Sequence, residues 1–383
     1  MSKLDELITE LCPEGVKYKK IKQVYKRLKG TPITAGKMKE IDNPNGEIRI
    51  FAGGKTVINA MEKDIPNANI TRVPAVLVQS RGVIDAVYYD KPFTFKNEMW
   101  AYTADNEVAV KYLYYVLKSN LSYFRKAASG MGSLPQISLR VTEEFVIPIP
   151  PLPVQQEIVR ILDNFTELTA ELTAELTARR KQYEYYRDLL LTFGDDVPRL
   201  AISDLLIRTK GTNITAQKMR QLHKENGEVR IFAGGKTYAD VDFKDIPKKD
   251  INLNPSIIVK SRGIIEFEYY DKPFSHKNEF WSYYSENKNV NIKFVYYYLS
   301  KNVNYFQRIA NNMQMPQISI PVTDKYKVPL PPIKEQERIV AILDRFDALC
   351  NDLTSGIPAE IEARQKQYEY YRDKLLSFKE VTA

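Results

Sequence analysis

The chain has 383 residues, which predicts more than one compact unit, and 44% hydrophobic residues with 11% aromatics suffice for buried cores. It lacks a membrane-length apolar run and opens without a signal-peptide pattern, so a cytoplasmic protein without membrane contact is expected. Cys12, Cys350, His223 and His276 are too few and too scattered for a disulfide framework, a zinc site or histidine catalysis, while 56 Lys and Arg against 48 Asp and Glu (net +8) favour a polyanionic partner.

Residues 1 to about 150 alternate short β-rich runs with Gly, Pro and Asn, which predicts a domain of mixed strands and helices. Strands are expected at 48–52, 75–79 and 83–89, and a helix at 107–126. Prolines at 148, 150, 151 and 153 predict a stiff extended segment, because proline interrupts the interior of a strand or a helix. A domain boundary is therefore expected there.

The same order of motifs then returns in the second half of the chain. GEIRIFAGGKT at 46–56 recurs as GEVRIFAGGKT at 227–237, an offset of 227 − 46 = 181 residues. The motifs SRG at 80–82, YYDKPF at 88–93, KNE at 96–98 and PQIS at 135–138 recur at this same offset. An internal duplication of a whole structural unit is therefore predicted.

Each copy ends in an apolar stripe with helical spacing, from Ile158 to Phe193 and from Ile339 to Phe378. Because neither stripe is broad enough to fold alone, the two helices are expected to pair as an antiparallel coiled coil with a pseudo-two-fold axis. KQYEYYRD recurs with an offset of 366 − 181 = 185, so the second helix is expected to be four residues longer.

Two further features mark these helices. The tetrapeptide TAEL occurs at 169–172 and again at 173–176, and it is interpreted as a spacer between the domains or, alternatively, as plain helix-forming sequence. SGIP at 355–358 predicts a break in the second helix with a restart at Pro358. The fold class is therefore α+β, with duplicated mixed α/β domains at 1–150 and 196–331 and helical spacers at 151–195 and 332–383.

No motif predicts a catalytic residue, a metal site or a cofactor on this chain. GGKT at 53–56 and 234–237 lacks the earlier glycine of a phosphate-binding loop, since Arg49 and Arg230 stand in that position. A tight turn that touches a DNA phosphate and a plain hairpin turn are the alternatives. Carboxylates near lysines, such as Glu98, occur in nucleases but are also common on solvated surfaces.

Side chains suited to DNA recognition recur in both copies. A loop arginine can bond a guanine edge and an asparagine or glutamine an adenine edge, whereas other Lys and Arg residues bind phosphates. The alternative for each residue is a turn position that bonds its own backbone. The predicted DNA-binding residues are Arg49, Lys55, Arg81, Lys96, Asn97 and Gln136, and Arg230, Lys236, Arg262, Lys277, Asn278 and Gln317.

Tyrosines crowd at 183–187 and again at 368–372, in greater number than one helix seam can bury. Surplus Tyr and Arg on a helix are typical of a protein interface, and packing against the neighbouring domain is the alternative. The predicted partner-binding residues are Tyr183, Tyr186, Arg187, Tyr368, Tyr371 and Arg372.

This layout resembles the specificity subunits of type I restriction-modification systems. Their helical regions open with a Pro-Pro and Glu-Gln signature, which corresponds to Pro150-Pro151 with Gln155-Gln156 and to Pro331-Pro332 with Glu335-Gln336. Val154 departs from this signature, because it stands where the second copy has Glu335. The resemblance spans essentially the whole chain.

The resemblance implies a noncatalytic subunit whose two target-recognition domains each read one half of a bipartite sequence in double-stranded DNA. It also implies that the helices recruit two methyltransferase subunits, which methylate adenine N6, and that restriction subunits join them. S-adenosylmethionine, ATP and Mg are expected on those partners. Because the two copies share their loops, the half-sites are expected to be alike and inverted, a near-palindrome with an unread middle.

Three other interpretations stay open. A self-contained nuclease or methyltransferase would be active without partners. A stand-alone sequence-specific DNA-binding regulator would bind its site tightly as an isolated chain. A coiled-coil scaffold would have no affinity for DNA.

Overall fold

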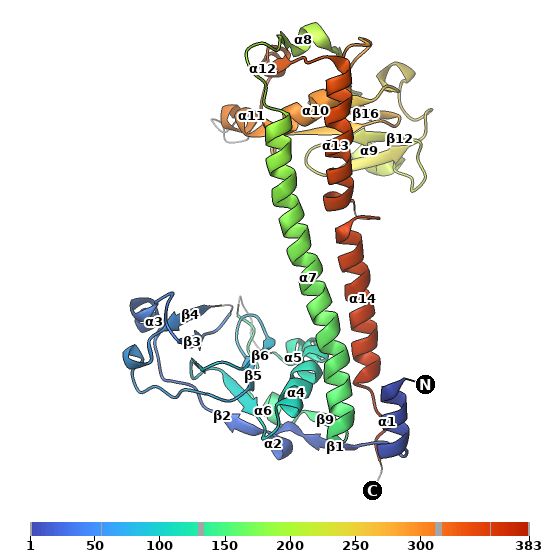
Figure 1. Ribbon diagram of the computed structural model, residues 1–383. Helices are drawn as coiled ribbons and strands as arrows, with labels where there is room; N and C mark the ends of the chain where they lie inside the picture. Colours follow the sequence, from blue (N-terminus) through green and yellow to red (C-terminus); the bar gives the residue numbers. More distant parts are fainter. Residues whose placement is uncertain (1, 55, 129–133, 311–315, 353, 382–383) are drawn as a thin grey trace. The chain divides into compact units, whose positions relative to one another are not determined.

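The computed structural model describes the chain except residues 1, 55, 129–133, 311–315, 353 and 382–383 (Figure 1). Its contacts divide into two units. Unit 1 combines Met1–Thr173 with Glu360–Ala383, and unit 2 is Ala174–Ala359. Each unit therefore joins one mixed domain to parts of both helical spacers, and the boundaries expected from the sequence stay predictions. No helix in the described ranges is long and apolar enough to cross a membrane.

Unit 1 alternates short strands with helices before the first long helix begins. Its elements are α1 (Lys3–Leu11), β1 (Lys17–Lys20), α2 (Ile21–Val24), β2 (Lys26–Leu28), α3 (Ala35–Ile41), β3 (Ile48–Phe51), β4 (Val57–Ala60), η1 (Glu62–Asp64), β5 (Ala75–Gln79), β6 (Asp85–Tyr89), β7 (Phe93–Phe95), β8 (Trp100–Thr103), α4 (Glu107–Ser119), α5 (Leu121–Ala127), α6 (Leu139–Glu143), β9 (Val146–Ile149) and α7 (Leu152–Leu190), which continues into unit 2.

Two small sheets form the domain of unit 1. One has four strands in the order β2-β8-β5-β6, and the other has three in the order β4-β3-β7, with β3 and β7 parallel. Side chains alternate between the two faces of β3. Ile48 and Ile50 pack with Met38 of α3, whereas Phe51 packs with Phe93 on the side of the larger sheet. The strands expected at 48–52, 75–79 and 83–89 are confirmed as β3, β5 and β6.

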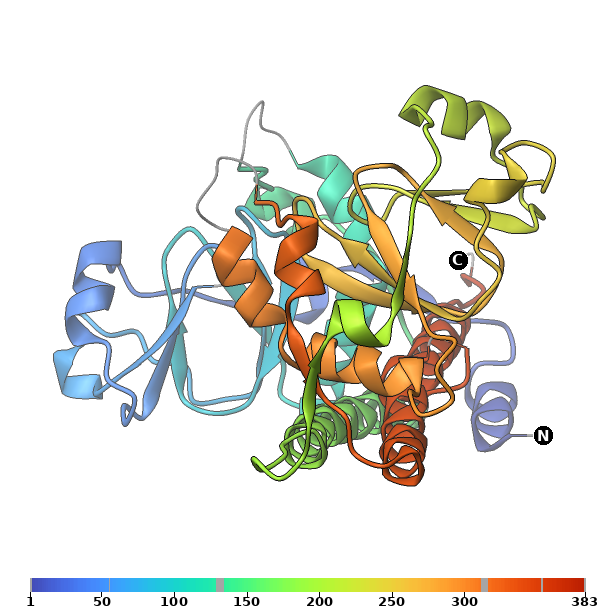
Figure 2. The same ribbon diagram turned by 90° about the horizontal axis from the view of Figure 1, so that it is seen from above.

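Unit 2 repeats this architecture. Its sheets have the orders β11-β17-β14-β15 and β13-β12-β16. Figure 2 shows α9 beside the strands of the smaller sheet, as α9 packs on β13. The elements are β10 (Arg199–Ala201), α8 (Ile202–Leu205), β11 (Ile207–Thr209), α9 (Ala216–Leu222), β12 (Val229–Phe232), β13 (Tyr238–Val241), η2 (Lys248–Asp250), β14 (Ser256–Lys260), β15 (Glu266–Tyr270), β16 (Phe274–His276), β17 (Trp281–Tyr284), α10 (Ile292–Lys301), α11 (Val303–Ala310), α12 (Ile320–Asp324), β18 (Lys327–Pro329) and α13 (Ile333–Asn351). The last helix, α14 (Ile357–Leu375), belongs to unit 1 from Glu360 on.

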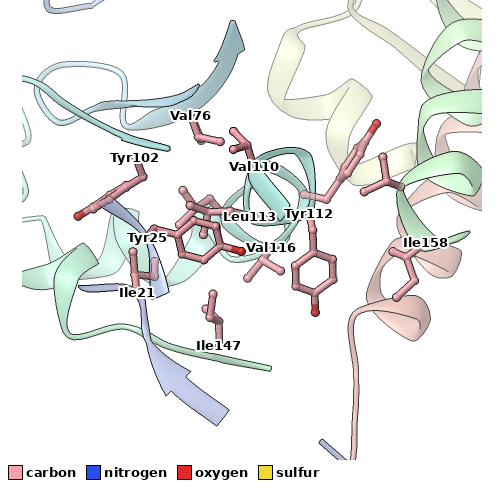
Figure 3. Close-up of a cluster of buried hydrophobic side chains, with 14 of the residues drawn as sticks. Ile21, Tyr25, Val76, Tyr102, Val110, Tyr112, Leu113, Val116, Ile147 and Ile158 are labelled. Atoms are coloured by element: carbon pink, nitrogen blue, oxygen red, sulfur yellow. The ribbon is translucent and has the colours of Figure 1, made fainter. Parts of the chain in front are cut away.

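The main core of unit 1 connects the four-stranded sheet to the long helix through α4. Figure 3 shows Val76 and Tyr102 of the sheet, Val110 and Leu113 of α4, and Ile158 of α7 gathered in one cluster. All five side chains are completely buried. Burial of each such side chain contributes about 1.5–3 kcal/mol, so the domain is fixed to the beginning of α7.

The long helices pair within each unit. In unit 1 Phe165 of α7 stacks on Tyr371 of α14, with ring centroids 5.6 Å apart. In unit 2 Tyr186 of α7 stacks on Phe346 of α13, with ring centroids 5.7 Å apart. Figure 1 shows α14 antiparallel to the part of α7 beside it. The prediction of duplicated mixed domains with antiparallel paired helices is confirmed within each unit.

The second long helix is interrupted, as the sequence predicts. The segment 352–356 separates α13 from α14, and Pro358 lies in the first turn of α14, where it costs no hydrogen bond. Asp352 Oδ1 accepts the amide N–H of Thr354 at 2.7 Å, which stabilises the turn. The prediction that this helix is simply four residues longer is wrong, because the additional residues lie in the break.

Two further expectations need correction. Pro148 lies inside β9, opposite Tyr18 of β1, and Pro153 lies in the first turn of α7. A short two-stranded ladder and a helix start both tolerate proline, so the expected extended segment shrinks to residues 150–151. The helix expected at 107–126 is also divided, since Asn120 ends α4 and precedes α5.

The two ends of the chain close unit 1. Val16 forms a parallel bridge with Glu380, and its N–H donates to the carbonyl of Lys379 at 2.9 Å. The Tyr18 hydroxyl donates to the carbonyl of Phe378 at 2.8 Å. The segment after α14 therefore holds the beginning of the domain in place.

Candidate nucleic-acid interface

In unit 1 the two predicted base-reading side chains Arg81 and Gln136 stand opposite each other in an antiparallel bridge. Two backbone hydrogen bonds, each 2.9 Å long, join segment 80–82 to segment 135–137 on either side of this pair. In a pair of this non-hydrogen-bonded type the two side chains leave the same face at close spacing. An arginine and a glutamine are therefore held side by side, which suits adjacent guanine and adenine edges.

Unit 2 repeats the arrangement. Arg262 and Gln317 form the antiparallel bridge, and backbone hydrogen bonds of 2.9 and 3.0 Å join segment 261–263 to segment 316–318. Both arginines are exposed. The turns SRG and PQIS, which are far apart in the sequence, thus form one loop cluster in each unit, and the KNE segment completes it. We call these the unit 1 cluster (80–83, 96–98 and 134–137) and the unit 2 cluster (261–264, 277–279 and 316–318).

Buried hydrogen bonds fix the position of each cluster. In unit 1 the hydroxyl of Ser80 donates to the carbonyl of Glu98, which ties the SRG turn to the KNE segment. Thr142 of α6 accepts from Trp100 Nε1 at 2.9 Å and shares a 2.7 Å hydrogen bond with the hydroxyl of Tyr102. Since α6 comes directly after the PQIS turn, this network anchors the segment that carries Gln136. The same bonds recur in unit 2 around Ser261 and Thr323.

The predicted phosphate-binding lysines are already engaged in ion pairs. Lys96 Nζ lies 3.0 Å from a carboxylate oxygen of Glu98, and Lys277 Nζ lies 2.7 Å from a carboxylate oxygen of Glu279. Each lysine is half-buried. A DNA phosphate would have to compete with this carboxylate, so the exposed arginine carries most of the available positive charge in each cluster.

Asn97 and Asn278 are exposed at the middle of the KNE segments. In unit 1 this segment separates two hollows. Lys96 and Arg81 line one of about 450 Å³, and Asn97 lines another of about 500 Å³. Asn97 is therefore close to Arg81 in the fold but faces a different depression.

The GGKT motifs lie between strands that pair antiparallel, β3 with β4 and β12 with β13. Gly54 and Gly235 have φ angles of +74° and +64°, which favour glycine. The N–H of Gly54 donates to the carbonyl of Arg81 at 3.1 Å, which places this turn next to the unit 1 cluster. A strand rather than a helix comes after each turn, so the fold does not support a nucleotide phosphate loop. Lys55 lies outside the described residues, and Lys236 is exposed.

Arg49 and Arg230 are not brought into the clusters. The guanidinium of Arg49 lies 5.7 Å from the ring centroid of Tyr89, at the far end of β6 from the SRG turn. Arg230 forms bonds of 2.7 and 3.0 Å with the carboxylate of Asp240, which raises the pKa of the arginine. In unit 1 the residue opposite Arg49 on the neighbouring strand is Asn59, where unit 2 has Asp240. Arg49 therefore forms no ion pair with any residue that the structure describes. A phosphate role for these arginines stays a prediction.

One basic residue near the unit 1 cluster was missed by sequence reasoning. Lys39 of α3 lines the same hollow as Arg81 and Lys96. Arg220 stands 181 residues later, since 220 − 39 = 181. A basic residue repeated at the offset of the duplication was the available signal. The hollow also contains Asp42, whose counterpart at that offset is His223.

The predicted partner-binding tyrosines divide into two groups. Tyr183 and Tyr368 pack against the cores, and burial raises the pKa of Tyr183 to about 12. Tyr186 and Tyr371 stack between helices but keep 37% and 42% of their surface exposed. Packing against the neighbouring domain therefore accounts for Tyr183 and Tyr368, whereas Tyr186 and Tyr371 keep surface that a partner can contact.

The two arginines of the predicted set lie beside the half-buried tyrosines Tyr183 and Tyr368. Arg187 lies 5.8 Å from the ring centroid of Tyr183, and Arg372 lies 5.6 Å from that of Tyr368. Each arginine also pairs with the aspartate next to it in the sequence. These contacts orient the two guanidinium groups along the helix surface.

The most exposed aromatic residues of the patch are outside the predicted set. Tyr185 is 65% exposed and Tyr370 is 64% exposed. Leu189 is 57% exposed one turn after Tyr185. Their positions off the apolar stripe were the signal in the sequence. Together with Tyr186 and Tyr371 they give each unit an exposed apolar strip on its helix pair.

The described part of the chain contains no group of three His, Cys, Asp or Glu side chains arranged to hold a metal ion. Cys12 and Cys350 are both buried and free. Burial raises the pKa of each thiol above its usual value.

A family model of the type I restriction modification DNA specificity domain matches residues 13–179 and 200–363. The specificity subunit of the Escherichia coli type I restriction enzymes EcoR124I and EcoR124II is 35% identical over 295 residues, which cover 72% of each chain. A putative type I specificity subunit of Mycoplasma pneumoniae is 26% identical over 378 residues, which cover 94% of this chain and 97% of the relative.

Solved structures agree on the fold. The crystal structure of a type I restriction-modification S subunit from M. genitalium matches with a TM-score of 0.63 at 17% identity. The match covers 96% of this chain and 97% of that chain. With the family model matched in both halves and a related specificity subunit aligned over most of its length, the chain belongs to the family of type I restriction-modification DNA specificity subunits and contains two copies of the specificity domain.

Proposed function

We propose that this chain is the noncatalytic subunit that reads DNA in a type I restriction-modification complex, with each unit reading one half of a bipartite site. The observation that carries the proposal is the repeated cluster, in which an exposed arginine stands beside a glutamine on a rigid bridge in both units. Direct readout of base edges needs such preset donors and acceptors. The excess of positive charge, +8 for the chain, favours binding to the DNA backbone.

The half-sites are proposed to be alike and inverted, so that the whole site is a near-palindrome with an unread middle. The support is the identity of the SRG, KNE and PQIS motifs in the two clusters. Positions that differ near the clusters, such as Asp42 in unit 1 and His223 in unit 2, are where the two half-sites would diverge.

The exposed aromatic strips on the helix pairs are proposed to bind two methyltransferase subunits, one on each unit. Tyrosine and leucine on an exposed helix face are typical of protein interfaces. The partners would supply adenine N6 methylation with S-adenosylmethionine, and restriction subunits would add ATP- and Mg-dependent cleavage. The complex would act on DNA in the cytoplasm.

Modified-base sequencing tests this function directly. DNA from cells that express the chain with its neighbouring methyltransferase subunit is compared with DNA from cells that lack the chain. We expect an N6-methyladenine motif with two inverted halves that depends on the chain. If the methylation motif were the same with and without the chain, the proposal would be refuted. Tight, sequence-specific DNA binding by the isolated chain would favour a stand-alone regulator. Two unrelated half-sites would refute only the near-palindrome.

Variants of the arginine turn sharpen the test. Arg81→Ala should relax or abolish recognition of one half-site, and Arg262→Ala should do so for the other, with each lost guanine contact weakening binding by about 1–3 kcal/mol. Arg72→Ala is the matched control, because Arg72 is exposed in unit 1 but pairs with Glu62 outside the cluster. If the methylated DNA motif were the same in all three variants, the SRG arginines would have no role in base recognition.

A further inference from the structure

An exposed aliphatic side chain comes directly after the SRG turn in each unit. Val83 is 40% exposed in unit 1, and Ile264 is 70% exposed in unit 2. Ile264 is the most exposed of the large hydrophobic residues in the described ranges. Single exposed apolar residues are ordinary on protein surfaces, so exposure alone assigns nothing. The position of Ile264, two residues after the predicted guanine-reading Arg262, is what distinguishes it.

The backbone around Ile264 is held on both sides. Ile265 is 1% exposed within the core of unit 2, and its carbonyl accepts from Gln307 Nε2 at 3.0 Å. On the other side, the N–H of Gly263 donates to the carbonyl of Pro316 at 2.9 Å. Because a rigid segment loses little freedom on binding, its exposed side chain is preorganised for a ligand.

The tip of this turn is the exposed residue Gly263. Gly263 has a φ of +74°, and a Cβ added there would have no atom of the described residues within 4 Å. The side chain of Ile264, which is 70% exposed, is therefore accessible to a ligand.

We infer that Ile264 contacts the C5-methyl group of a thymine in the major groove, next to the base that Arg262 reads. This inference rests on the proposed function. The thymine methyl is the apolar group that base pairs display in the major groove, where arginine bonds guanine. Two residues span at most about 7 Å. Since base pairs are stacked about 3.4 Å apart, the isoleucine reaches a base pair within about two steps of the guanine.

Val83 has the corresponding place in unit 1 with a shorter side chain. A Cβ added to Gly82 would lie 3.7 Å from Leu134 and 3.6 Å from Gly54. Val83 is also less exposed than Ile264, 40% against 70%. We expect the methyl contact to be weaker in the half-site read by unit 1.

Deoxyuridine substitution tests the contact, because it removes only the C5-methyl group of thymine. Once the site is known, duplexes with one thymine replaced at a time are titrated with the full chain in complex with its methyltransferase partner. For the wild type, one position in the unit 2 half-site should lower affinity about fourfold, as expected for one buried methyl group. Ile264→Ala should bind the thymine and deoxyuridine duplexes equally.

Leu253→Ala is the matched control, since Leu253 is also in unit 2 and is 64% exposed. This variant should keep the wild-type preference for thymine. Thermal melting of both variants checks that they fold, which is expected because the substituted side chains lie on the surface.

Three results would overturn the inference while leaving the proposed function intact. Ile264→Ala could keep the wild-type sensitivity to deoxyuridine. The wild type could bind every deoxyuridine duplex as tightly as the thymine duplex. The unit 2 half-site could contain no A·T pair. If the wild-type complex instead failed to bind any site selectively, the proposed function itself would fail together with the inference.

Discussion

Unit 2 buries a histidine at a position where unit 1 has no ionisable residue. His276 is completely buried on β16, and its Nε2 lies 3.1 Å from the hydroxyl of Ser282. Burial lowers the pKa of His276 from 6.5 to about 4. The corresponding residues of unit 1 are Phe95 and Ala101, since 276 − 95 = 181 and 282 − 101 = 181.

The lowered pKa predicts that unit 2 loses stability in mild acid. The folded state keeps His276 neutral, whereas the unfolded chain takes up a proton below pH 6.5. The stabilisation is therefore complete above that pH and is lost as the pH falls toward about 4. Its full size is about 3 kcal/mol.

Urea denaturation at pH 7.5 and pH 5 measures this loss. The double variant His276→Phe/Ser282→Ala, which copies the residues of unit 1, should be less destabilised between the two pH values than the wild type. An equal loss of unfolding free energy in both proteins would contradict the role of the histidine.

At the scale of elements, the break between α13 and α14 depends on close backbone packing at Gly356. A Cβ added there would lie 2.6 Å from the carbonyl oxygen of Ala348 and 2.7 Å from that of Asp352. Gly356→Ala should therefore destabilise unit 2 by about 1–3 kcal/mol, as overpacking does elsewhere.

Thermal melting compares this variant with Gly36→Ala. Gly36 lies in α3, where an added Cβ would approach only the Thr34 hydroxyl, at 4.0 Å. That substitution should be neutral or stabilising, because alanine favours helices over glycine by about 1 kcal/mol. A stable Gly356→Ala protein would mean that the break does not need glycine.

The TAEL repeat lies in the uninterrupted helix α7, and the boundary between the units falls within it, at Thr173. Deleting residues 173–176 shortens α7 by about 6 Å. Four residues make about 400° of helix, so the remainder of α7 is rotated by only about 40° beyond one full turn. The unread middle of the DNA site should therefore shorten by one or two base pairs, while both half-sites stay unchanged.

Modified-base sequencing of cells with the deletion variant measures the spacing. Replacing residues 173–176 by four alanines keeps the helix length and should keep the spacing. A changed half-site in the deletion variant, or an unchanged spacing, would show that the repeat is not a spacer.

For the whole molecule, the central expectation is that each unit binds one methyltransferase subunit through its exposed aromatic strip. Tyr185→Ala and Tyr370→Ala should each weaken binding of one subunit by about tenfold, or about 1.4 kcal/mol, and the double variant should weaken both. Tyr123→Ala is the control, since Tyr123 is 49% exposed on α5 rather than on a long helix. Native mass spectrometry of titrated complexes counts the bound methyltransferase subunits. If the double variant still bound two methyltransferase subunits as fully as the wild type, the aromatic strip would not be their binding site.

The sequence by itself determined the duplication, the class of each unit and the course of the long helices. These conclusions depend on local signals, namely the repeated motifs, the apolar stripes and the Gly-Pro break at 355–358. It also indicated Arg81, Gln136 and their counterparts as residues suited to DNA, because residue chemistry and repetition can be read without a fold.

Only the tertiary structure decided which of those residues act together. Arg81 and Gln136 become neighbours through a bridge between distant segments. Arg230 is occupied by Asp240 across a strand pair, whereas Arg49 faces Asn59. Such outcomes depend on strand register and on side chains that meet across the fold, which sequence spacing does not encode. The same reason explains why packing partly buries Tyr183 while the neighbouring Tyr185 and Tyr186 of its helix remain exposed.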